Sequence, residues 1–248
     1  MEISDFFSKK KTPAVSYESY YSIDIHSHII PGIDDGAQTI EESLEIIAFF
    51  QSIGIKKIIT TPHISGSYPN TNDIILSCYS QLKNKLIEIN PDIDLHVAAE
   101  YMVDESFTNI IKQKKLLCFG KNFILIEFPY FSTHPDIHNV IFSLQSDGFS
   151  IIIAHPERYV FWGDTLNTFK KLKERGVFFQ MNLLSLTSIY SEEIQKNAHW
   201  LIKNQLIDFV GSDIHHISAA PYIKNVLKEK LFFKMIETNQ IKNNALLT

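Results

Sequence analysis

Short apolar runs rich in β-branched residues alternate along this chain with longer segments of helical periodicity. Such runs predict buried strands, whereas apolar side chains three and four residues apart predict helices. Strands are expected at about residues 22–26, 55–60, 93–99, 122–128, 149–154, 177–182 and 207–212. Helices are expected at about residues 40–53, 71–89, 135–146, 165–175, 191–204 and 219–237. The pattern therefore predicts about seven strand–helix units.

This alternation favours parallel strands joined by right-handed crossovers. Chemically versatile side chains follow nearly every expected strand, as in a barrel, whose active site is formed by the C-terminal ends of many strands. An open doubly wound sheet would concentrate such residues at one point instead. We therefore expect an α/β fold, a closed or distorted barrel that forms a single domain over residues 21–248. Residues 1–20 are expected to form a polar, partly disordered N-terminal extension.

The candidate chemistry lies in four motifs, DIHSH (24–28), TPH (61–63), AHPER (154–158) and SDIH (212–215). Strand side chains alternate between two faces, so residues i and i+2 point the same way. His26 with His28, and Asp213 with His215, are therefore expected to form chelating pairs. Imidazole combined with carboxylate suits a hard or borderline divalent metal ion. The residues by themselves indicate metal-assisted hydrolysis.

Composition narrows the class of partner and the compartment. A formal net charge of -5 and a pI near 6.0 leave no broad cationic surface, which argues against nucleic acid as a partner. Cys78 and Cys118 form no CxxC motif, which is typical of a reduced intracellular protein. No apolar run reaches the roughly 18–20 residues that span a bilayer, and no signal-peptide core is present. We expect a cytoplasmic protein that is not inserted in a membrane.

Six segments in a fixed order carry a family resemblance: DIHSHIIPGIDDGA, TTPH, AAEY, IEFP, AHPERY and GSDIHH. Over about residues 22–230 the chain resembles the bacterial metal-dependent protein-tyrosine phosphatases of the PHP (polymerase and histidinol phosphatase) superfamily. The resemblance implies a distorted TIM-like (β/α)7 barrel of the PHP type with three metal ions at the strand ends. It implies Mn2+, with Fe, Zn or Mg as alternatives. It also implies hydrolysis of phosphotyrosine on a protein partner, the tail of a bacterial tyrosine kinase that controls polysaccharide synthesis and export.

The same resemblance, carried over motif by motif, implies a set of metal ligands. The first ion would be held by His26, His28, Glu100 and Asp213. Glu100 would bridge to the second ion, held also by Glu127 and His155. The third ion would be held by Asp35, His63 and His215. Asp35 is preferred to its neighbour Asp34 because of its spacing from the histidine pair in the family.

Arg158 is one of only two arginines among 23 basic residues, and it directly follows the His-Pro-Glu motif. We expect its planar guanidinium to clamp the phosphate in a bidentate contact while hydroxide formed from a metal-bound water attacks. The alternative is a structural ion pair between Arg158 and Glu157. Residues 217–221 lack a second basic residue that often follows the SDxH motif in the family, so phosphate binding would depend more on Arg158. Tyrosine leaves with a pKa of about 10, so no general acid is assigned.

Four further residues lie near the motifs, and three of them have two interpretations each. Asp24 either orients a metal ligand or accepts a hydrogen bond from a backbone amide. Tyr159 and Trp162 either stack on an aryl phosphate or pack in the core. Tyr130 follows the strand that ends in Glu127, which makes it a candidate for a substrate-binding loop.

Three alternative functions can be weighed on the same residues. A cysteine-based tyrosine phosphatase needs an arginine six positions after its cysteine, and neither Cys78 nor Cys118 has one. A small-molecule phosphatase of the same superfamily, acting on histidinol phosphate, stays open, although Asp35 and Glu127 stand where that branch is associated with histidine. A non-catalytic phosphotyrosine-binding regulator also stays open, but clustered carboxylates without a function would repel one another. The pattern carries no signal for an oligomeric state.

Overall fold

The computed structural model describes residues 20–89, 92–112, 115–130, 137–159 and 165–247. Its strands are β1 (Ile23–Asp24), β2 (Lys57–Thr60), β3 (His63–Ile64), β4 (Asp94–Val97), β5 (Glu100–Met102), β6 (Phe123–Glu127), β7 (Ser150–Ala154), β8 (Phe178–Asn182) and β9 (Phe209–Gly211). Its α-helices are α1 (Ile40–Ser52), α2 (Asn72–Ile89), α3 (Phe107–Lys112), α4 (Ile137–Ser146), α5 (Thr165–Glu174), α6 (Glu192–Lys203), α7 (Ala220–Val226) and α8 (Lys230–Asn239). Residues 1–19 of the expected extension and Trp162 lie outside the described ranges, so the predictions about them stay predictions.

The strands form two parallel sheets that continue into each other. One sheet has the order β1-β2-β4, and the other has the order β3-β5-β6-β7-β8-β9. Pro62 has no N–H to donate, and it lies between β2 and β3, just beyond the predicted strand 55–60. Pairing nevertheless carries on across the break, because the Ala98 N–H donates to the Thr60 carbonyl (2.9 Å) and the Glu100 N–H to the Pro62 carbonyl (3.1 Å). Two segments of the chain, 57–64 and 94–102, therefore run from one sheet into the other.

The first and last strands meet just beyond their C-terminal ends. The His28 N–H donates to the Ile214 carbonyl (3.0 Å), and the Asp213 N–H donates to the His26 carbonyl (2.8 Å). An isolated parallel bridge also joins Ser27 to Ile214, although no continuous ladder pairs β1 with β9 in the described residues. The fold is thus a parallel α/β structure of the distorted TIM-like kind, which confirms the predicted fold class.

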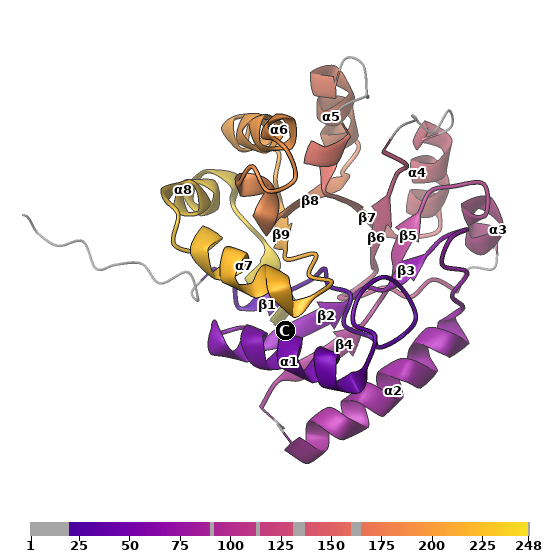
Figure 1. The fold of residues 1–248 in the computed structure, drawn as a ribbon. Coiled ribbons are helices and arrows are strands. Elements are labelled where there is room, and N and C mark those ends of the chain that lie inside the picture. The colour runs from indigo at the N-terminus through magenta and orange to yellow at the C-terminus, as the bar shows by residue number, and fades with distance from the viewer. Residues whose placement is uncertain (1–19, 90–91, 113–114, 131–136, 160–164, 248) are drawn as a thin grey trace, which may run out of the picture.

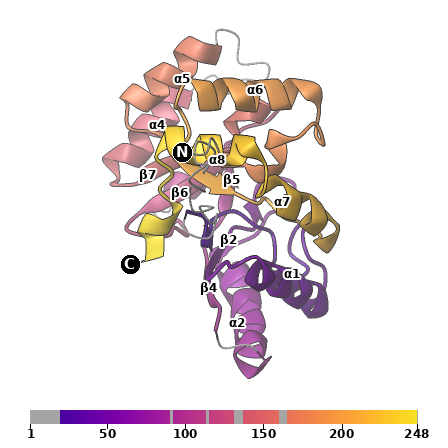
Figure 2. The ribbon, with the colours of Figure 1, turned by 90° about the vertical axis from the view of Figure 1, so that its left-hand side faces the viewer.

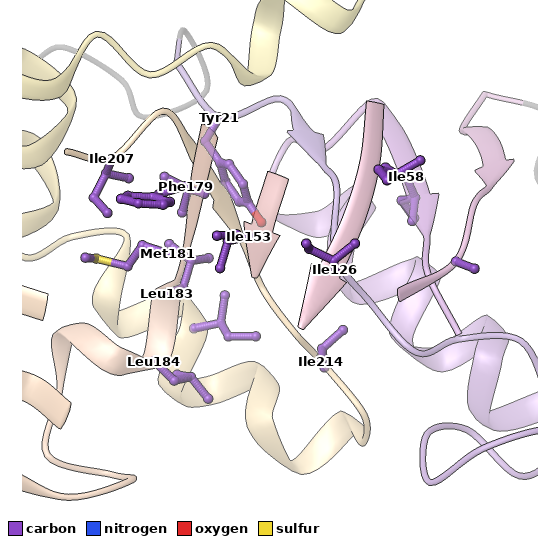
Figure 3. Packing of buried hydrophobic residues seen from close by; sticks show 14 of the residues in the cluster. Tyr21, Ile58, Ile126, Ile153, Phe179, Met181, Leu183, Leu184, Ile207 and Ile214 are labelled. Carbon is purple, nitrogen blue, oxygen red and sulfur yellow. The ribbon is translucent and has the colours of Figure 1, made fainter. Parts of the chain in front are cut away.

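The strands are buried on both faces, as a parallel sheet requires. Figure 1 shows the helices arranged around the strands. Ile126 and Ile153 face the helices and belong to the large core cluster shown in part in Figure 3. Their neighbours Leu125 and Ile152 point the opposite way, into a smaller cluster inside the barrel. This alternation explains why the sequence reads as nearly continuous apolar runs.

One predicted helix, 219–237, is wrong in extent because α7 and α8 are separate. Glu229 between them is extended, with φ -73° and ψ 141°. Leu227 and Phe232 are both fully buried. The step between them is longer than the three or four residues that keep side chains on one helix face, so one straight helix could not bury both. The predicted strand 93–99 corresponds to β4, whereas β5 and α3 lie where no strand and no helix were predicted.

The C-terminal segment packs at the end of the barrel opposite the strand C-termini. The fully buried Asn243 donates to the carbonyls of Ile23 (3.0 Å) and Val210 (2.7 Å) and accepts from the Val210 N–H (2.9 Å). Its side chain thereby ties β1 to β9 where the two strands do not pair with each other. Leu246 packs on the cluster inside the barrel, and Figure 2 shows this segment in yellow at the barrel edge.

No helix in the described part of the chain combines the length and the apolar character that crossing a membrane requires.

Candidate metal centre and active site

All ten residues proposed from the sequence gather at the C-terminal ends of the strands. A pocket of about 240 Å³ is lined by eight of them, Asp35, His63, Glu100, Glu127, His155, Arg158, Asp213 and His215. His26 and His28 lie fully buried in contact with Glu100 and Asp213. The strand ends of a parallel barrel converge, so residues far apart in the sequence become neighbours here.

The innermost group joins the two histidines after β1 to two carboxylates. The Nε2 atoms of His26 and His28 are 3.3 Å apart. Glu100 Oε2 lies 3.2 Å from the first nitrogen and 3.4 Å from the second. Asp213 Oδ1 lies at the same two distances, 3.2 Å and 3.4 Å. Four ligand atoms thus face one point between them, and all four residues are buried.

Glu100 is also the centre of a second group. His63 Nδ1 lies 3.2 Å from Glu100 Oε2 and 3.1 Å from Glu127 Oε1. His155 Nε2 lies 3.2 Å from Glu100 Oε1 and 3.6 Å from Glu127 Oε2. The two carboxylates therefore lie between two imidazoles, with Glu100 shared between this group and the innermost one.

The outermost group contains Asp35, which is about half exposed. Its Oδ1 lies 3.5 Å from the Nε2 atoms of both His63 and His215, and its side chain has 51% relative exposure. His28 is close enough to this group to share it. Asp34 has a different place, because its Oδ2 lies 2.9 Å from His28 Nδ1, on the far side of that ring. This geometry supports the choice of Asp35 over Asp34 as the ligand.

The backbone is bent to bring these side chains together. His155 and Asp213 have positive φ values of 34° and 51°, a region that costs a residue other than glycine about 1–3 kcal/mol. Gly36 allows the Asp34–Asp35 loop to fold against the strand end, since a Cβ there would lie 2.0 Å from the His28 carbonyl oxygen. Two of the four described non-glycine residues with positive φ are therefore candidate ligands, the other two being Gln205 and Gln240 away from the pocket.

Imidazoles and carboxylates at such short range change one another's pKa. Burial alone lowers the pKa of His26, but the charges of Glu100 and Asp213 outweigh burial and raise it to about 10. Burial raises the pKa of Glu100, yet His26 and His155 lower it well below the usual range. Burial also raises the pKa of Asp213, but the charges of His26, Arg158 and His215 outweigh burial and lower this pKa well below its usual range. Without a metal ion, a proton on His26 helps to balance the charge of these carboxylates.

The donor set fits divalent metal ions. Glu100 Oε2 and Glu127 Oε1 are buried carboxylate oxygens that receive no hydrogen bond of good geometry among the described residues. Leaving such oxygens without a partner costs free energy, and a cation would satisfy both. Imidazole nitrogens and carboxylate oxygens suit Mn2+, Fe2+, Zn2+ or Mg2+, and neither cysteine lines the pocket.

Arg158 lies at the pocket wall, on a 3-10 turn (Pro156–Arg158) directly after β7. One of its terminal nitrogens is 3.1 Å from Asp213 Oδ2, and the other donates to the Tyr130 hydroxyl at 3.1 Å. The guanidinium stacks on Tyr190, 4.2 Å from the ring centroid. Glu157 accepts instead from a backbone N–H at 3.0 Å, so the proposed ion pair between Glu157 and Arg158 is wrong.

Asp24 and Tyr159, which had two interpretations, have structural roles. Asp24 accepts hydrogen bonds from the Tyr21 hydroxyl (2.5 Å) and the Ser212 N–H (2.8 Å), so the backbone interpretation is confirmed. Tyr159 is fully buried, and its hydroxyl accepts from the Phe128 N–H at 3.0 Å. Tyr159 therefore packs in the core and does not face a substrate.

Sequence reasoning missed the residues that support the histidines from behind. Asp34 supports His28, and Gln180 Oε1 lies 2.7 Å from His26 Nδ1. It also missed Tyr68, whose ring stacks on His63 with centroids 5.4 Å apart and lines the pocket. A signal for Gln180 existed in the run Phe178–Asn182, because a polar side chain facing a barrel interior needs a partner there.

A parallel α/β barrel with clustered imidazoles and carboxylates at its strand ends is the architecture of a metal-dependent hydrolase. The chain belongs to the capsular polysaccharide synthesis family CpsB/CapC, whose sequence model matches residues 22–244. The family resemblance drawn from the six motifs is thereby confirmed.

Similar proteins point the same way. The tyrosine-protein phosphatase YwqE of Bacillus subtilis is 33% identical over 201 residues, which cover 79% of this chain and 78% of that protein. The tyrosine-protein phosphatase CpsB of Streptococcus agalactiae is 27% identical over 206 residues, covering 80% and 85%. YwqE and the CpsB of Streptococcus pneumoniae, whose crystal structures are known, are metal-dependent tyrosine phosphatases. The matched chain superposes with a TM-score of 0.76 and 28% identity, covering 91% of this chain and 94% of that one.

Proposed function

We propose that this chain is a metal-dependent protein-tyrosine phosphatase. The observation that carries the proposal is the pocket in which buried imidazoles and carboxylates lie beside a stacked arginine. The CpsB/CapC family membership and the similarity to YwqE and CpsB support the same activity. The physical problem in this reaction is a phosphate dianion that repels nucleophiles, so positive charge must be concentrated at the site.

We propose three Mn2+ ions as the cofactor, held by the three groups of ligands described above, with Fe, Zn or Mg as alternatives. Bound there, divalent ions would neutralise phosphoryl oxygens and lower the pKa of a water molecule to make a nucleophile near neutral pH. Glu100 has the central role, because its two oxygens face different histidines. The neutral forms of the histidines present nitrogen lone pairs, so protons held in the metal-free protein must leave first.

Arg158 supplies fixed positive charge from the protein. Among the described residues that line the pocket it is the sole lysine or arginine. Tyr130 and Tyr190 hold its guanidinium in one orientation, and Asp213 neutralises it until an anion arrives. The planar group can then donate two parallel hydrogen bonds to phosphoryl oxygens, a geometry that a lysine cannot reproduce. The turn after Asp213 (Ile217–Ala219) contains no basic residue, so this task falls on Arg158.

The wall of the pocket suits an aryl phosphate. Tyr68, Met102 and Tyr130 line it, so that apolar and aromatic surface lies in the same pocket as the charged cluster. The Tyr68 ring is nearly parallel to that of His63, at 11°, and presents its other face away from the cluster. A phenolic ring stacks favourably on such surfaces, which favours phosphotyrosine over phosphoserine.

The partner we propose is a tyrosine-phosphorylated protein, the tail of a bacterial tyrosine kinase, encountered in the cytoplasm. An extended tail suits a pocket at the barrel surface, because the phosphorylated side chain can enter while the peptide backbone stays outside. The two cysteines are free, in keeping with a reducing compartment.

A comparison of kcat/KM on a phosphotyrosine peptide and on histidinol phosphate tests this proposal. We expect the Mn2+-loaded protein to prefer the peptide by at least about 10²-fold, which corresponds to about 2.7 kcal/mol in transition-state binding. Preference for histidinol phosphate would favour the small-molecule phosphatase. Peptide binding without phosphate release, in metal-loaded protein, would favour the non-catalytic regulator.

A further inference from the structure

Strand β8 ends in two amides where neighbouring strands end in metal-ligand candidates. Gln180 and Asn182 are fully buried and point to the same face, the barrel interior, because they are two positions apart. The residues between and beside them, Phe179 and Met181, face the helices in the large core cluster. Buried amides need hydrogen-bond partners. These two find them in each other and in His26 and Asp213 of the proposed metal centre.

The amides link two candidate ligands in one chain of hydrogen bonds. His26 Nδ1 lies 2.7 Å from Gln180 Oε1. Gln180 Nε2 donates to Asn182 Oδ1 at 2.9 Å, and Asn182 Nδ2 donates to Asp213 Oδ2 at 2.7 Å. The path thus starts at an imidazole after β1, crosses β8 and ends at a carboxylate after β9.

The direction of every bond follows from its last acceptor. An ionised Asp213 can only accept, so Asn182 must present its NH2 to it and its oxygen to Gln180. Gln180 must then donate to Asn182 and present its own oxygen to His26. An oxygen there accepts, so His26 must carry a proton on Nδ1. In neutral His26 the Nε2 lone pair is consequently free, and Nε2 is the atom that faces Glu100 and Asp213.

A glycine makes room for the first link. A Cβ on Gly211 of β9 would lie 2.6 Å from the Cβ of His26 and 2.8 Å from Nε2 of Gln180. These distances are far below van der Waals contact, so any side chain at this position would force the two residues apart. The close approach of His26 and Gln180 is therefore built into the backbone of the adjacent strand.

The other end of the path is equally constrained. Asp213 Oδ2 is occupied by Asn182 and by Arg158, which lies 3.1 Å away. Its second oxygen, Oδ1, faces His26 and His28, the two histidines that follow β1. Asn182 is held in turn through its backbone N–H, which donates to the buried Glu157. At each end of the path, one atom is held by an amide, namely His26 Nδ1 or Asp213 Oδ2. The other atom, His26 Nε2 or Asp213 Oδ1, faces the cluster of candidate metal ligands.

We propose that Gln180 and Asn182 are positioning residues through which Asp213 selects the Nδ1–H tautomer of His26, reserving His26 Nε2 and Asp213 Oδ1 for one metal ion. This inference rests on the proposed metal centre. It assigns two residues that would touch neither the metal ion nor the substrate but would decide which ligand atoms are presented. His28 differs, because its Nδ1 is supported directly by the carboxylate of Asp34.

We call this chain of hydrogen bonds, from His26 through Gln180 and Asn182 to Asp213, the relay. Mn2+ binding tests the relay without reference to activity. Gln180→Met removes the acceptor at similar length, and Gln195→Met is the matched control, since Gln195 donates to the Leu186 carbonyl away from the pocket. Isothermal titration of the metal-free proteins should show one ion bound about 10–100-fold more weakly in Gln180→Met, the others being within about threefold of wild type. The control should titrate like the wild type.

Two further variants separate positioning from simple packing. Gln180→Glu keeps an acceptor for His26 and should retain more affinity than Gln180→Met, whereas a pure packing role would order them the other way. Asn182→Leu should weaken the same ion, and the double variant Gln180→Met/Asn182→Leu should lose less than the sum of the single losses. Nitrogen-15 spectra of the Zn2+-loaded wild type should show a protonated Nδ1 on His26.

The relay is overturned if a folded Gln180→Met, with its metal-free unfolding transition intact, binds Mn2+ with wild-type affinity at every site. It is equally overturned by a His26 that carries its proton on Nε2. If Gln180→Met does not fold, the Mn2+ affinities of Gln180→Glu and Asn182→Leu, each compared with that of the wild type, decide the question. A wild-type protein that takes up no Mn2+ overturns the proposed metal centre and the relay together, whereas normal wild-type uptake with normal uptake by the variants overturns the relay alone.

Discussion

The two ends of the barrel are formed by the same strands, yet they differ in almost every physical property. The C-terminal ends carry buried imidazoles and carboxylates, together with positive φ values at His155 and Asp213. At the opposite end β6, β8 and β9 begin with Phe123, Phe178 and Phe209, whose rings meet edge to face with centroids 5.5, 5.6 and 5.9 Å apart. One end gathers buried charge, and the other gathers aromatic contacts.

This difference assigns separate tasks to the two ends. Buried charges of like sign and left-handed residues oppose folding, so the charged end depends on stabilisation from elsewhere. The phenylalanine cluster and the C-terminal segment anchored by Asn243 provide it. Substitutions at the charged end should therefore affect metal binding and turnover, whereas substitutions at the apolar end should affect stability first.

The largest effect is expected at Glu100, whose two oxygens face different histidines. Glu100→Ala should remove ligands from two ions at once and lower turnover by more than about 10³-fold. Metal analysis of the purified variant should show fewer bound ions than wild type. Glu105→Ala, at an exposed position, is the control and should leave both quantities unchanged. A Glu100→Ala protein with a full complement of metal would contradict the central role of Glu100.

Arg158→Ala should separate turnover from metal binding at the same end. Loss of the guanidinium removes the phosphate clamp, so kcat/KM should fall by about 10²-fold or more while bound metal stays close to wild type. Arg175→Ala, which removes the chain's other arginine, should be without effect on either. His155→Ala should instead reduce metal occupancy itself. Equal metal loss in Arg158→Ala and His155→Ala would show that the arginine is misassigned.

Metal affinity should fall as the pH falls. Glu100 and Asp213 outweigh burial and raise the pKa of metal-free His26 to about 10, and the pKa values of His28 and His63 are raised as well. Near pH 7 His26 therefore carries a proton that a metal ion must displace, so binding should release at least one proton per protein. Titration calorimetry in two buffers of different ionisation enthalpy measures this number, and a value of zero would contradict the ion-pair arrangement.

The raised pKa of His26 makes the stability of the metal-free fold depend on pH in the opposite direction to metal affinity, so that stability falls as the pH rises. A histidine whose pKa is raised on folding stabilises the folded state fully below its unfolded value, about 6.5, and loses this contribution as the pH rises through about 10. Metal-free protein should therefore unfold more easily at pH 10 than at pH 7. Added Mn2+ should reduce the difference, because it takes over the compensation of Glu100 and Asp213.

Asn243→Ala tests the apolar end and should have the smallest effect on the chemistry. It removes a buried side chain with three backbone hydrogen bonds, which should lower the free energy of unfolding by about 2–4 kcal/mol. Mn2+ affinity and kcat of the folded fraction should stay within about twofold of wild type. The exposed Asn225→Ala is the matched control in urea unfolding. Loss of metal binding at unchanged stability would show that the two ends are not independent.

Much of this architecture could be predicted from the sequence because the strands are short, apolar and buried on both faces. The strands β3 and β5 were not predicted, since they are only two and three residues long and lie beyond the apolar runs 55–60 and 93–99. The division of 219–237 was missed because no glycine or proline marks it, although the step from Leu227 to Phe232 breaks the helical period. In both cases tertiary packing overrides a local pattern.

The site shows the same division between strong and weak local signals. Paired polar residues such as His26 and His28 have a spacing that stands out at the end of an apolar run. The partners behind them, Asp34 and Gln180, have side chains common anywhere, and only the fold shows what they contact. The contact of Arg158 with Asp213, rather than with Glu157, likewise depends on how the strand ends converge.

Phosphate release after removal and return of the metal tests the central claim most directly. The protein would be stripped with a chelator, reloaded with Mn2+ and assayed on matched phosphotyrosine and phosphoserine peptides. The proposed function predicts that the stripped protein is inactive and that Mn2+ restores release from the phosphotyrosine peptide, with much slower release from phosphoserine. Activity that survives complete metal removal, or reloaded protein that cleaves neither peptide, would contradict a metal-dependent tyrosine phosphatase.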